Sequence, residues 1–320
     1  MRVWSRQLSF GGGGPIPGLA LAAGTAVISG VSVYLNSYGV RSVPDAAVYT
    51  TAKNLVAAAI LLLAVTLWHG TRGARSVPAG APPSPEARRN RWGRRLGLAY
   101  VGVVGGGAAF IMFFSGLAQS SAQPAAFLHD TLVVWVAVLA WPFLRERVSG
   151  WNLLAIGLLV AGEVAVAGGT GQLSMGPGAG LVLGATLLWA LETVVAKRLL
   201  GTLSPGRVAT TRMGVGAAVL LAYLGITGSF GGLLTLAPGQ WSWALLTGLL
   251  LAAYVGTWMG ALARARAVDV TSILVGSVVV TTLLSAAFGV GGLAPEGAGL
   301  VLVAMGVVLV ARMGPRAAAA

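Results

Sequence analysis

The chain has 320 residues, of which 56% are hydrophobic and only 9% are charged. A soluble domain has about a quarter of its residues charged, so this composition excludes an ordinary soluble enzyme or binding module. A net charge of +13 is in itself compatible with nucleic acid as a partner, but the distribution of the basic residues argues against it, because they fall between apolar runs. The absence of cysteine excludes disulfides and thiolate chemistry.

Ten apolar runs follow one another along the chain, and each is a candidate membrane span. A helix needs about 20 apolar residues to cross a hydrocarbon core of about 30 Å. The alternating polarity of barrel strands is missing, so we expect an all-α polytopic membrane protein; nine spans are the alternative, since several runs are short. The ten predicted spans are 19–40, 46–68, 96–118, 123–144, 151–168, 179–199, 207–226, 241–262, 268–289 and 295–312.

The first run is expected to be retained rather than cleaved. Arg2 and Arg6 ahead of an apolar stretch also occur in signal peptides. Here "GGGGPIPG" separates these charges from a run of full span length that carries Asn36 between two tyrosines. We therefore predict that 1–18 is a cytoplasmic segment followed by a first span.

The basic residues favour alternate connections between the spans. Apart from Arg41, Lys53 and Arg212, all of them lie at the termini or in the loops after the second, fourth, sixth and eighth spans. Cytoplasmic loops are rich in Lys and Arg, so we expect both termini in the cytoplasm. The longest loop, 69–95, is expected to be irregular and to determine topology; an anionic-lipid or partner site is the alternative.

The chain also resembles itself. "GLAQSSAQPAAFLHDTLVVWVAVLAW", which begins at Gly116, aligns with "GALARARAVDVTSILVGSVVVTTLLS", which begins at Gly260. The same offset pairs Gly162 with Gly306. The sequence therefore predicts two related halves.

An upstream match places a basic residue early in the second span of each half. "SVPDAAVYTTAKN" resembles "LSPGRVATTRMG", so Lys53 and Arg212 take nearly equivalent places. Five spans per half is an odd number, so the halves enter the membrane in opposite orientations, as in many transporters. We predict a first repeat at 19–170, a second at 171–312 and a cytoplasmic tail at 313–320.

A stretch at the end of the first half is similar to a known family. "LVVWVAVLAWPFLRERVSGWNLLAIGLLVAG", 132–162, resembles the fourth and fifth spans of EamA-type drug/metabolite transporters. Those spans are joined by a Gly-Glu-Arg-like turn. Glu146 matches the turn glutamate, Arg145 replaces the usual glycine, and Val290 stands where the second half lacks the glutamate. Lys53 lies where the family often has arginine.

The resemblance implies a ten-helix carrier of two inverted five-helix halves that moves, and often exports, small metabolites, amino acids or drugs. No zinc-protease, paired-aspartate or nucleotide-binding motif accompanies it, so we expect no enzyme activity, cofactor or metal, and coupling to protons or Na⁺. The alternatives are a passive channel or lipid scramblase, and a membrane-embedded lipid-modifying enzyme. The Arg, Ala, Gly and Val excess is typical of a GC-rich bacterium, and hence of its plasma (inner) membrane.

Six ionisable residues fall inside the predicted spans, where a central charge costs at least about 2.5–3.5 kcal/mol. Lys53, Asp130 and Glu163 share one depth, in the outer half of the membrane. We expect the two carboxylates to surround Lys53 in a hydrated cavity and either of them to exchange a proton with substrate; a structural ion pair is the alternative. The six residues are Lys53, His129, Asp130, Glu163, Glu192 and Arg212.

The remaining candidates follow from helix geometry. His129 is expected to face a neighbouring helix or the lipid headgroups, because adjacent residues point about 100° apart; a role as proton relay or ligand is the alternative. Glu192, one turn from Trp189, suits a cationic or amphipathic substrate, with pairing to Arg212 as the alternative. Arg212 is also near enough to the interface to snorkel. Weaker lining candidates are Asn36, Asn54 and Trp135.

Overall fold

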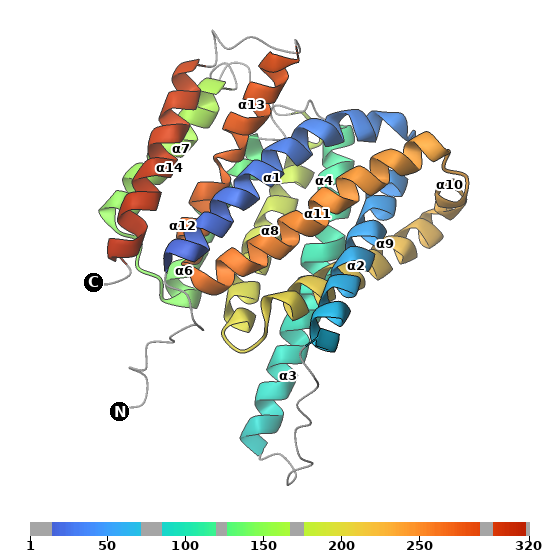
Figure 1. The fold of residues 1–320 in the computed structure, drawn as a ribbon, viewed down its shortest axis with the longest axis horizontal. Helices are drawn as coiled ribbons and strands as arrows, with labels where there is room; N and C mark the ends of the chain where they lie inside the picture. The colour runs from blue at the N-terminus through green and yellow to red at the C-terminus, as the bar shows by residue number, and fades with distance from the viewer. Residues whose placement is uncertain (1–14, 72–84, 120–126, 167–175, 289–296, 318–320) are drawn as a thin grey trace.

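The computed structural model describes residues 15–71, 85–119, 127–166, 176–288 and 297–317, and in these ranges every regular element is a helix (Figure 1). The first half contains α1 (Pro15–Ser42), α2 (Ala46–Thr71), α3 (Pro85–Tyr100), the π-helix η1 (Val101–Ala108), α4 (Ala109–Ala118), α6 (Leu132–Leu144) and α7 (Gly150–Val166). The second half contains α8 (Ala179–Leu200), α9 (Pro205–Thr227), α10 (Phe230–Leu234), α11 (Pro238–Arg264), α12 (Ala267–Leu274), α13 (Ser277–Ala287) and α14 (Gly297–Ala317).

Among the described residues, 8 helical segments are long and apolar enough to cross a membrane. The predicted fifth and tenth spans coincide with two shorter apolar helices, Gly150–Val166 and Gly297–Met313, so the count of ten is not confirmed. The eight longer segments are Pro17–Ser42, Ala46–Leu67, Arg91–Gly116, Phe127–Leu144, Ala179–Leu200, Pro205–Thr227, Pro238–Arg264 and Ala267–Ala287.

The prediction of an irregular loop at 69–95 was wrong for its second part. α3 begins at Pro85 and extends away from the other helices as a projecting arm (Figure 1). Proline fits the first helical turn, where its missing N–H has no partner to lose, and the arginines that follow are good helix formers. The charged segment therefore continues the helix of the third span outward, while 72–84 and Val290 lie outside the described residues.

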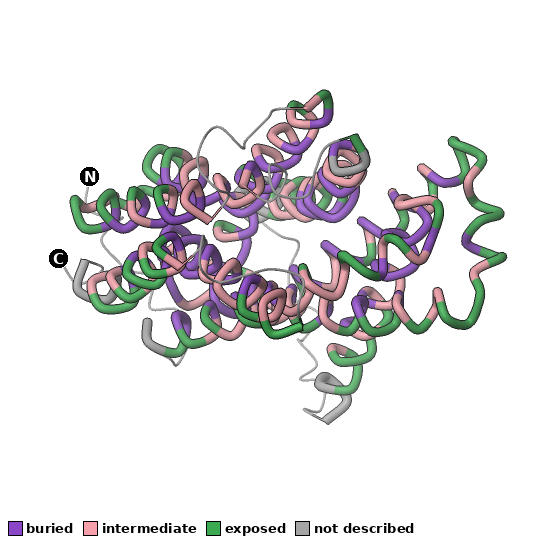
Figure 2. Tube along the Cα trace, turned by 90° about the horizontal axis from the view of Figure 1, so that it is seen from above, coloured by how far each residue is buried: buried purple, intermediate pink, exposed green. Residues whose placement is uncertain are grey.

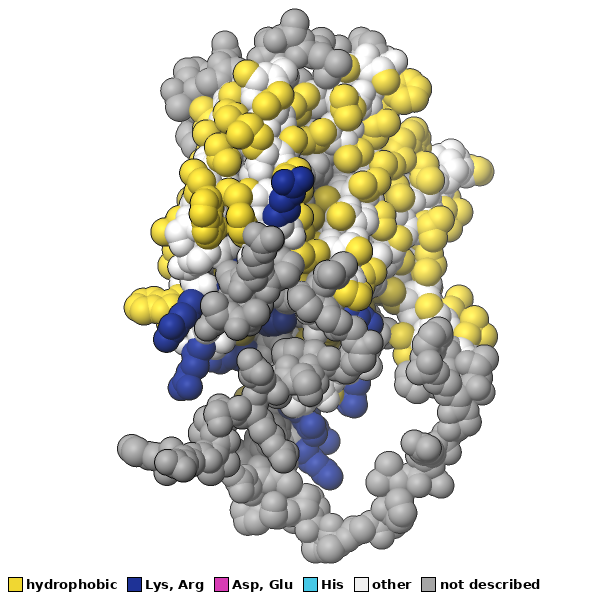
Figure 3. Space-filling model, turned by 60° about the vertical axis from the view of Figure 1, so that its left-hand side comes forward, with side chains coloured by type: hydrophobic (Ala, Val, Ile, Leu, Met, Phe, Trp, Pro, Cys, Tyr) yellow, Lys and Arg dark blue, Asp and Glu magenta, His cyan; other side chains and the backbone are white. Residues whose placement is uncertain are grey.

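The surface of the helical body is apolar. Large side chains such as Leu63, Leu67, Trp141 and Ile226 are exposed, whereas buried residues follow the faces that the helices turn toward one another (Figure 2). On the face drawn in Figure 3, hydrophobic side chains cover most of the described surface and Lys and Arg gather toward one end. An apolar surface of this extent is expected where lipid is the solvent.

The helices contact one another as the internal repeat predicts. α1 packs against α11 and against α12 and α13, and its counterpart α8 packs against η1 and α4 and against α6. α2 packs against α11 in the same way that α9 packs against η1. Counterparts also meet directly, in the pairs α2–α9, α6–α12 and α7–α14. Each main contact that a helix of the first half makes is therefore matched by a contact of its counterpart in the second half.

The contact between α7 and α14 is symmetrical at the level of single residues. A Cβ added to Gly162 would lie 2.6 Å from Val303 Cγ2, and one added to Gly306 would lie 2.8 Å from Leu159 Cγ. The offset that pairs Gly162 with Gly306 also pairs Leu159 with Val303. Gly162 on α7 and Gly306 on α14 thus each allow the facing helix to approach equally closely.

The predicted fourth and ninth spans are both interrupted by a tightened helical turn at equivalent positions. The fourth breaks at Thr131, between a helical turn at 127–130 and α6, and the ninth breaks at Val275 and Gly276, between α12 and α13. The repeat alignment places Thr131 opposite Val275. Thr131, Val275 and Gly276 keep right-handed helical backbone angles. Hydrogen bonds such as those from Val134 N–H to the Thr131 carbonyl and from Val278 N–H to the Val275 carbonyl close the turns, so each span continues through a tightened turn at the same place in the repeat.

The turn after α6 caps a helix of the other half. The carboxylate of Glu146 accepts hydrogen bonds from the backbone N–H groups of Ala267, at 3.0 Å, and Val268, at 3.3 Å, in the first turn of α12. Such a carboxylate satisfies donors that a helix leaves unpaired. Burial raises the pKa of Glu146, against the lowering effect of these N–H groups. The turn glutamate therefore joins the two halves.

Arg145 is the only non-glycine residue with positive φ, at 57°, in the described parts of the chain. A side chain in the left-handed region costs about 1–2 kcal/mol, which glycine avoids although it loosens the unfolded chain. We predict that Arg145→Gly stabilises the protein by about 1 kcal/mol and raises the thermal unfolding midpoint in detergent. A lower midpoint would show that the arginine contributes contacts worth more than its backbone strain.

The close α7–α14 contact predicts the effect of a single methyl group. Gly162→Ala places a Cβ against Val303, so we expect a loss of about 1–3 kcal/mol in stability, as for overpacking elsewhere. Gly157→Ala is the matched control on the same helix, because nothing lies within 4 Å of its added Cβ. Thermal unfolding of both variants should separate them; equal midpoints would contradict the packing.

Candidate functional site

Lys53 is buried on α2, with only 5% of its surface exposed. Its Nζ donates a hydrogen bond to Asn36 Oδ1, on α1, at 2.9 Å. The same atom lies over the rings of Tyr49 and Phe114, 5.5 and 5.0 Å from the centroids, where the ring faces partly offset the lost hydration of the ammonium. Within the described ranges, no carboxylate forms an ion pair with Lys53.

Asn36 is held in one orientation by its neighbours. Its Nδ2 donates to the backbone carbonyl of Ser32 at 2.7 Å and to the Ser32 hydroxyl at 3.0 Å. Its Oδ1 accepts from the hydroxyl of Tyr49 at 3.0 Å as well as from Lys53, and Tyr49 also meets Thr247 Oγ1, on α11, at 2.9 Å. Sequence reasoning missed Tyr49 and Thr247, although Tyr49 lies one helical turn before Lys53.

The second half carries the counterpart of this arrangement. Arg212 on α9 places Nε 3.2 Å from Glu192 Oε1 on α8, and both side chains are buried. A Cβ added to Gly106 on η1 would strike the backbone carbonyl of Arg212, and one added to Gly248 on α11 would strike that of Lys53. These matching contacts show that the two basic residues occupy equivalent places in the two halves.

The alternative in which Arg212 snorkels to the interface is therefore not the arrangement found. Glu192 supplies a buried counter-charge within direct reach, so the guanidinium has no need to extend to water. The alternative interpretation of Glu192, pairing with Arg212, is the one found. Removing charges from water costs several kcal/mol per ion, which a close partner of opposite charge offsets.

The two equivalent sites differ in their charge balance. Arg212 faces a carboxylate on α8, whereas Lys53 faces an amide on α1, the counterpart of α8 in the first half. An amide oxygen accepts a hydrogen bond but brings no formal charge. The first half therefore buries a cation for which the described residues provide no anion.

Asp130 and Glu163 line a cleft at the break in the fourth span. Thr131 and Val275, which mark the breaks in the fourth and ninth spans, line the same cleft. Glu163 is 6% exposed, and its Oε1 has no hydrogen-bond partner. The two carboxylates are thus brought together where both interrupted helices meet.

The expected cavity holding Lys53 between Asp130 and Glu163 is not what the structure shows. Aromatic rings separate the ammonium from the acidic cleft: Phe114 lies against Lys53, and Phe113 bridges Phe114, at 5.4 Å between centroids, to His129, at 5.5 Å. Span lengths predict a shared depth for the three residues but not the direction in which each side chain points, because that direction depends on how the helices rotate as they pack.

His129 faces neighbouring helices, as its position beside Asp130 predicts. Its ring meets Phe113 of α4 and Trp189 of α8, at 5.5 and 5.2 Å between centroids. Its Nδ1 lies 3.5 Å from Asp130 Oδ1. His129 thus lies between the cleft lined by Asp130 and the aromatic rings of Phe113 and Trp189.

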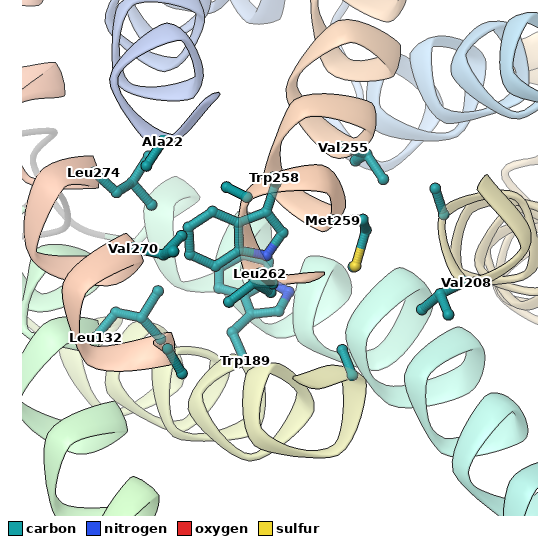
Figure 4. Close-up of a cluster of buried hydrophobic side chains, with 14 of the residues drawn as sticks. Ala22, Leu132, Trp189, Val208, Val255, Trp258, Met259, Leu262, Val270 and Leu274 are labelled. Carbon is teal, nitrogen blue, oxygen red and sulfur yellow. The ribbon is translucent and has the colours of Figure 1, made fainter. Parts of the chain in front are cut away.

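The two tryptophans among the candidates have structural partners. Trp189 donates its indole N–H to the carbonyl of Gly105 in η1 at 3.0 Å, where the π-helix departs from the regular α-helical pattern. It points into the main cluster of buried apolar side chains, as Trp258 of α11 does (Figure 4). Trp135 donates to Thr131 Oγ1 at 3.2 Å, beside the break. Asn54 donates to the backbone carbonyl of Thr50 at 2.7 Å.

The buried ion pair predicts a non-additive pair of substitutions. Glu192→Gln leaves Arg212 buried without a counter-charge, so we expect a loss of about 3–5 kcal/mol in stability. Adding Arg212→Met should recover a large part of this loss, because the uncompensated charge is then removed. Unfolding of the single and double variants in detergent measures the coupling; a double variant no more stable than Glu192→Gln would contradict it.

Comparison with known proteins agrees with this architecture. The model of the EamA-like transporter family matches residues 16–167 and 176–312, one copy in each half. No curated protein matches the chain. Among solved structures, one whose printed description reads "Crystal structure of protein" has a TM-score of 0.67 at 15% identity, covering 90% of this chain and 97% of that chain; at this identity the likeness shows the fold alone. The chain belongs to the EamA-like transporter family.

Proposed function

We propose that this protein is a secondary transporter of small organic metabolites, such as amino acids or drugs, that works by alternating access. One observation carries the proposal: Thr131 of the fourth span and Val275 of the ninth, at equivalent places in the repeat, line one cleft, and each half makes the same helix contacts as the other. Rocking of such halves about a fixed site opens it to one side and then to the other. The family supports transport, and the direction we propose is export.

The membrane arrangement that we propose has ten spans. The short helices α7 and α14 complete two inverted five-helix repeats, at 19–170 and 171–312. The basic residues that alternate between connections support cytoplasmic termini in a bacterial plasma membrane. The segments 1–18 and 313–320 then lie in the cytoplasm, as does most of 69–95.

We also propose that Asp130 and Glu163 couple transport to protons. They share one cleft, and Glu163 Oε1 is buried without a hydrogen-bond partner. A carboxyl group in this position can hold a proton in one conformation and release it when water enters in the other. Sodium is the alternative coupling ion, and replacing sodium in the flux assay distinguishes the two.

Flux into proteoliposomes tests the function. We expect saturable, countertransport-competent movement of at least one solute in a metabolite panel; non-saturable leakage would favour a passive channel, and lipid redistribution a scramblase. We predict that Asp130→Asn and Glu163→Gln lower proton-driven flux at least about 100-fold, the lower end of what a positioned proton-transfer group contributes.

Asp45→Asn is the matched control for these variants. Asp45 lies outside the cleft and caps α2 through the N–H of Ala47 at 2.8 Å, and asparagine caps a helix equally well. Its flux should equal that of the unaltered protein. Unchanged flux and unchanged pH dependence in both cleft variants would remove Asp130 and Glu163 from the mechanism.

A further inference from the structure

We infer that Lys53, held in place by Asn36 and its partner Tyr49, forms a subsite for the carboxylate of an organic anion with an apolar body. The inference rests on the proposed function and specifies the class of substrate. The anion supplies to Lys53 the counter-charge that Glu192 supplies to Arg212. In the second half the protein itself provides the anion, Glu192, whereas in the first half the substrate provides it.

The donors of Lys53 allow this. An ammonium has three N–H donors, and within the described residues its hydrogen-bond partner is the single oxygen Asn36 Oδ1. Asn36 cannot rotate to offer its own N–H group, because that group is held by Ser32. Two donors of the ammonium therefore remain for a carboxylate, whose two oxygens suit them.

The surroundings specify the rest of the substrate. Phe114 lies against Lys53 and continues into a layer of rings, with Phe110 at 6.4 Å and Phe113 at 5.4 Å between centroids. Phe110 and Phe113 both reach Trp189, at 5.3 and 5.4 Å. An apolar or aromatic body extending from the carboxylate would pack along this layer, which offers it no hydrogen bond and much dispersion contact.

The burial of Lys53 describes the closed form of the subsite. With 5% of its surface exposed, the ammonium is shielded in this conformation, as a carrier requires between its two open forms. An uncompensated buried charge makes the empty closed state costly, whereas a bound anion removes that cost. The arrangement therefore favours closure around the loaded subsite.

Three probes with one carbon skeleton test the inference on the purified full-length protein: phenylacetate, phenylacetamide and phenethylammonium. We expect phenylacetate alone to raise the thermal unfolding midpoint, with a dissociation constant at least about 10-fold below that of the amide, since a charge-assisted pair exceeds a neutral hydrogen bond. Equal shifts from all three probes, or no shift from phenylacetate, would overturn the inference.

Asn36→Asp is the decisive variant, because it gives Lys53 the internal carboxylate that Arg212 already has. The protein should remain folded with an unchanged or higher midpoint, and phenylacetate binding should fall at least about 10-fold. Lys53→Met, of similar size, should abolish the preference for the anion, and Lys53→Arg should keep it. Undiminished phenylacetate binding by folded Asn36→Asp, or by Lys53→Met, would overturn the inference.

Flux separates this inference from the proposed function. Saturable transport that treats the acid and its amide alike would leave the transporter standing and remove the carboxylate subsite. Carboxylate binding at Lys53 without movement of any solute would leave the subsite standing and remove the transporter.

Discussion

The structure depends on the cost of a charge that is taken out of water. Each half places one basic residue inside a helix that lipid and protein surround, and each must be compensated where it lies. In the second half the compensation is a direct ion pair between Arg212 and Glu192. In the first half Lys53 receives an amide oxygen and two ring faces. These neutral contacts lower the free-energy cost of burying the ammonium but do not neutralise its charge. The two halves therefore differ in whether the protein supplies a counter-charge to the buried basic residue.

Glycine makes the matching contacts possible. The carbonyls of Arg212 and Lys53 are approached by Gly106 and Gly248, and Gly105 leaves room for the side chain of Glu192. A larger residue at any of these places would push apart the helices that hold the basic groups. The same principle closes α7 on α14 through Gly162. Small residues therefore set the spacing within which the buried charges find their partners.

Much of this architecture could be predicted from the sequence, because it depends on periodic or repeated features. The apolar runs located the helices. The alignment that pairs Gly162 with Gly306 matches the symmetrical contact between α7 and α14, in which Gly162 meets Val303 and Gly306 meets Leu159. The equivalence of Lys53 and Arg212 was predicted in the same way. The projecting helix α3 was missed because proline and arginine suggest a loop, whereas at the start of a helix they favour it.

The sequence predicted which residues are candidates for the site better than it predicted how those residues are arranged in space. A shared depth in the membrane was predicted from residue counts, and Asp130 and Glu163 line one cleft in the structure. Separation of this pair from Lys53 depends on rings such as Phe113 that come from another span, and no local pattern indicates which faces of two helices turn together. The π-helix at η1 likewise changes the rotation of the third span in a way that a regular period of 3.6 residues cannot anticipate.

The central claim is that Lys53 is the one of the two equivalent buried basic residues that takes its counter-charge from the substrate. A crystal structure of the protein grown with phenylacetate tests it most directly. The account predicts the carboxylate within hydrogen-bond distance of Lys53 Nζ and an undisturbed pair between Glu192 and Arg212. A carboxylate bound at Arg212, or bound only on the outer surface with Lys53 paired to a protein carboxylate, would contradict it.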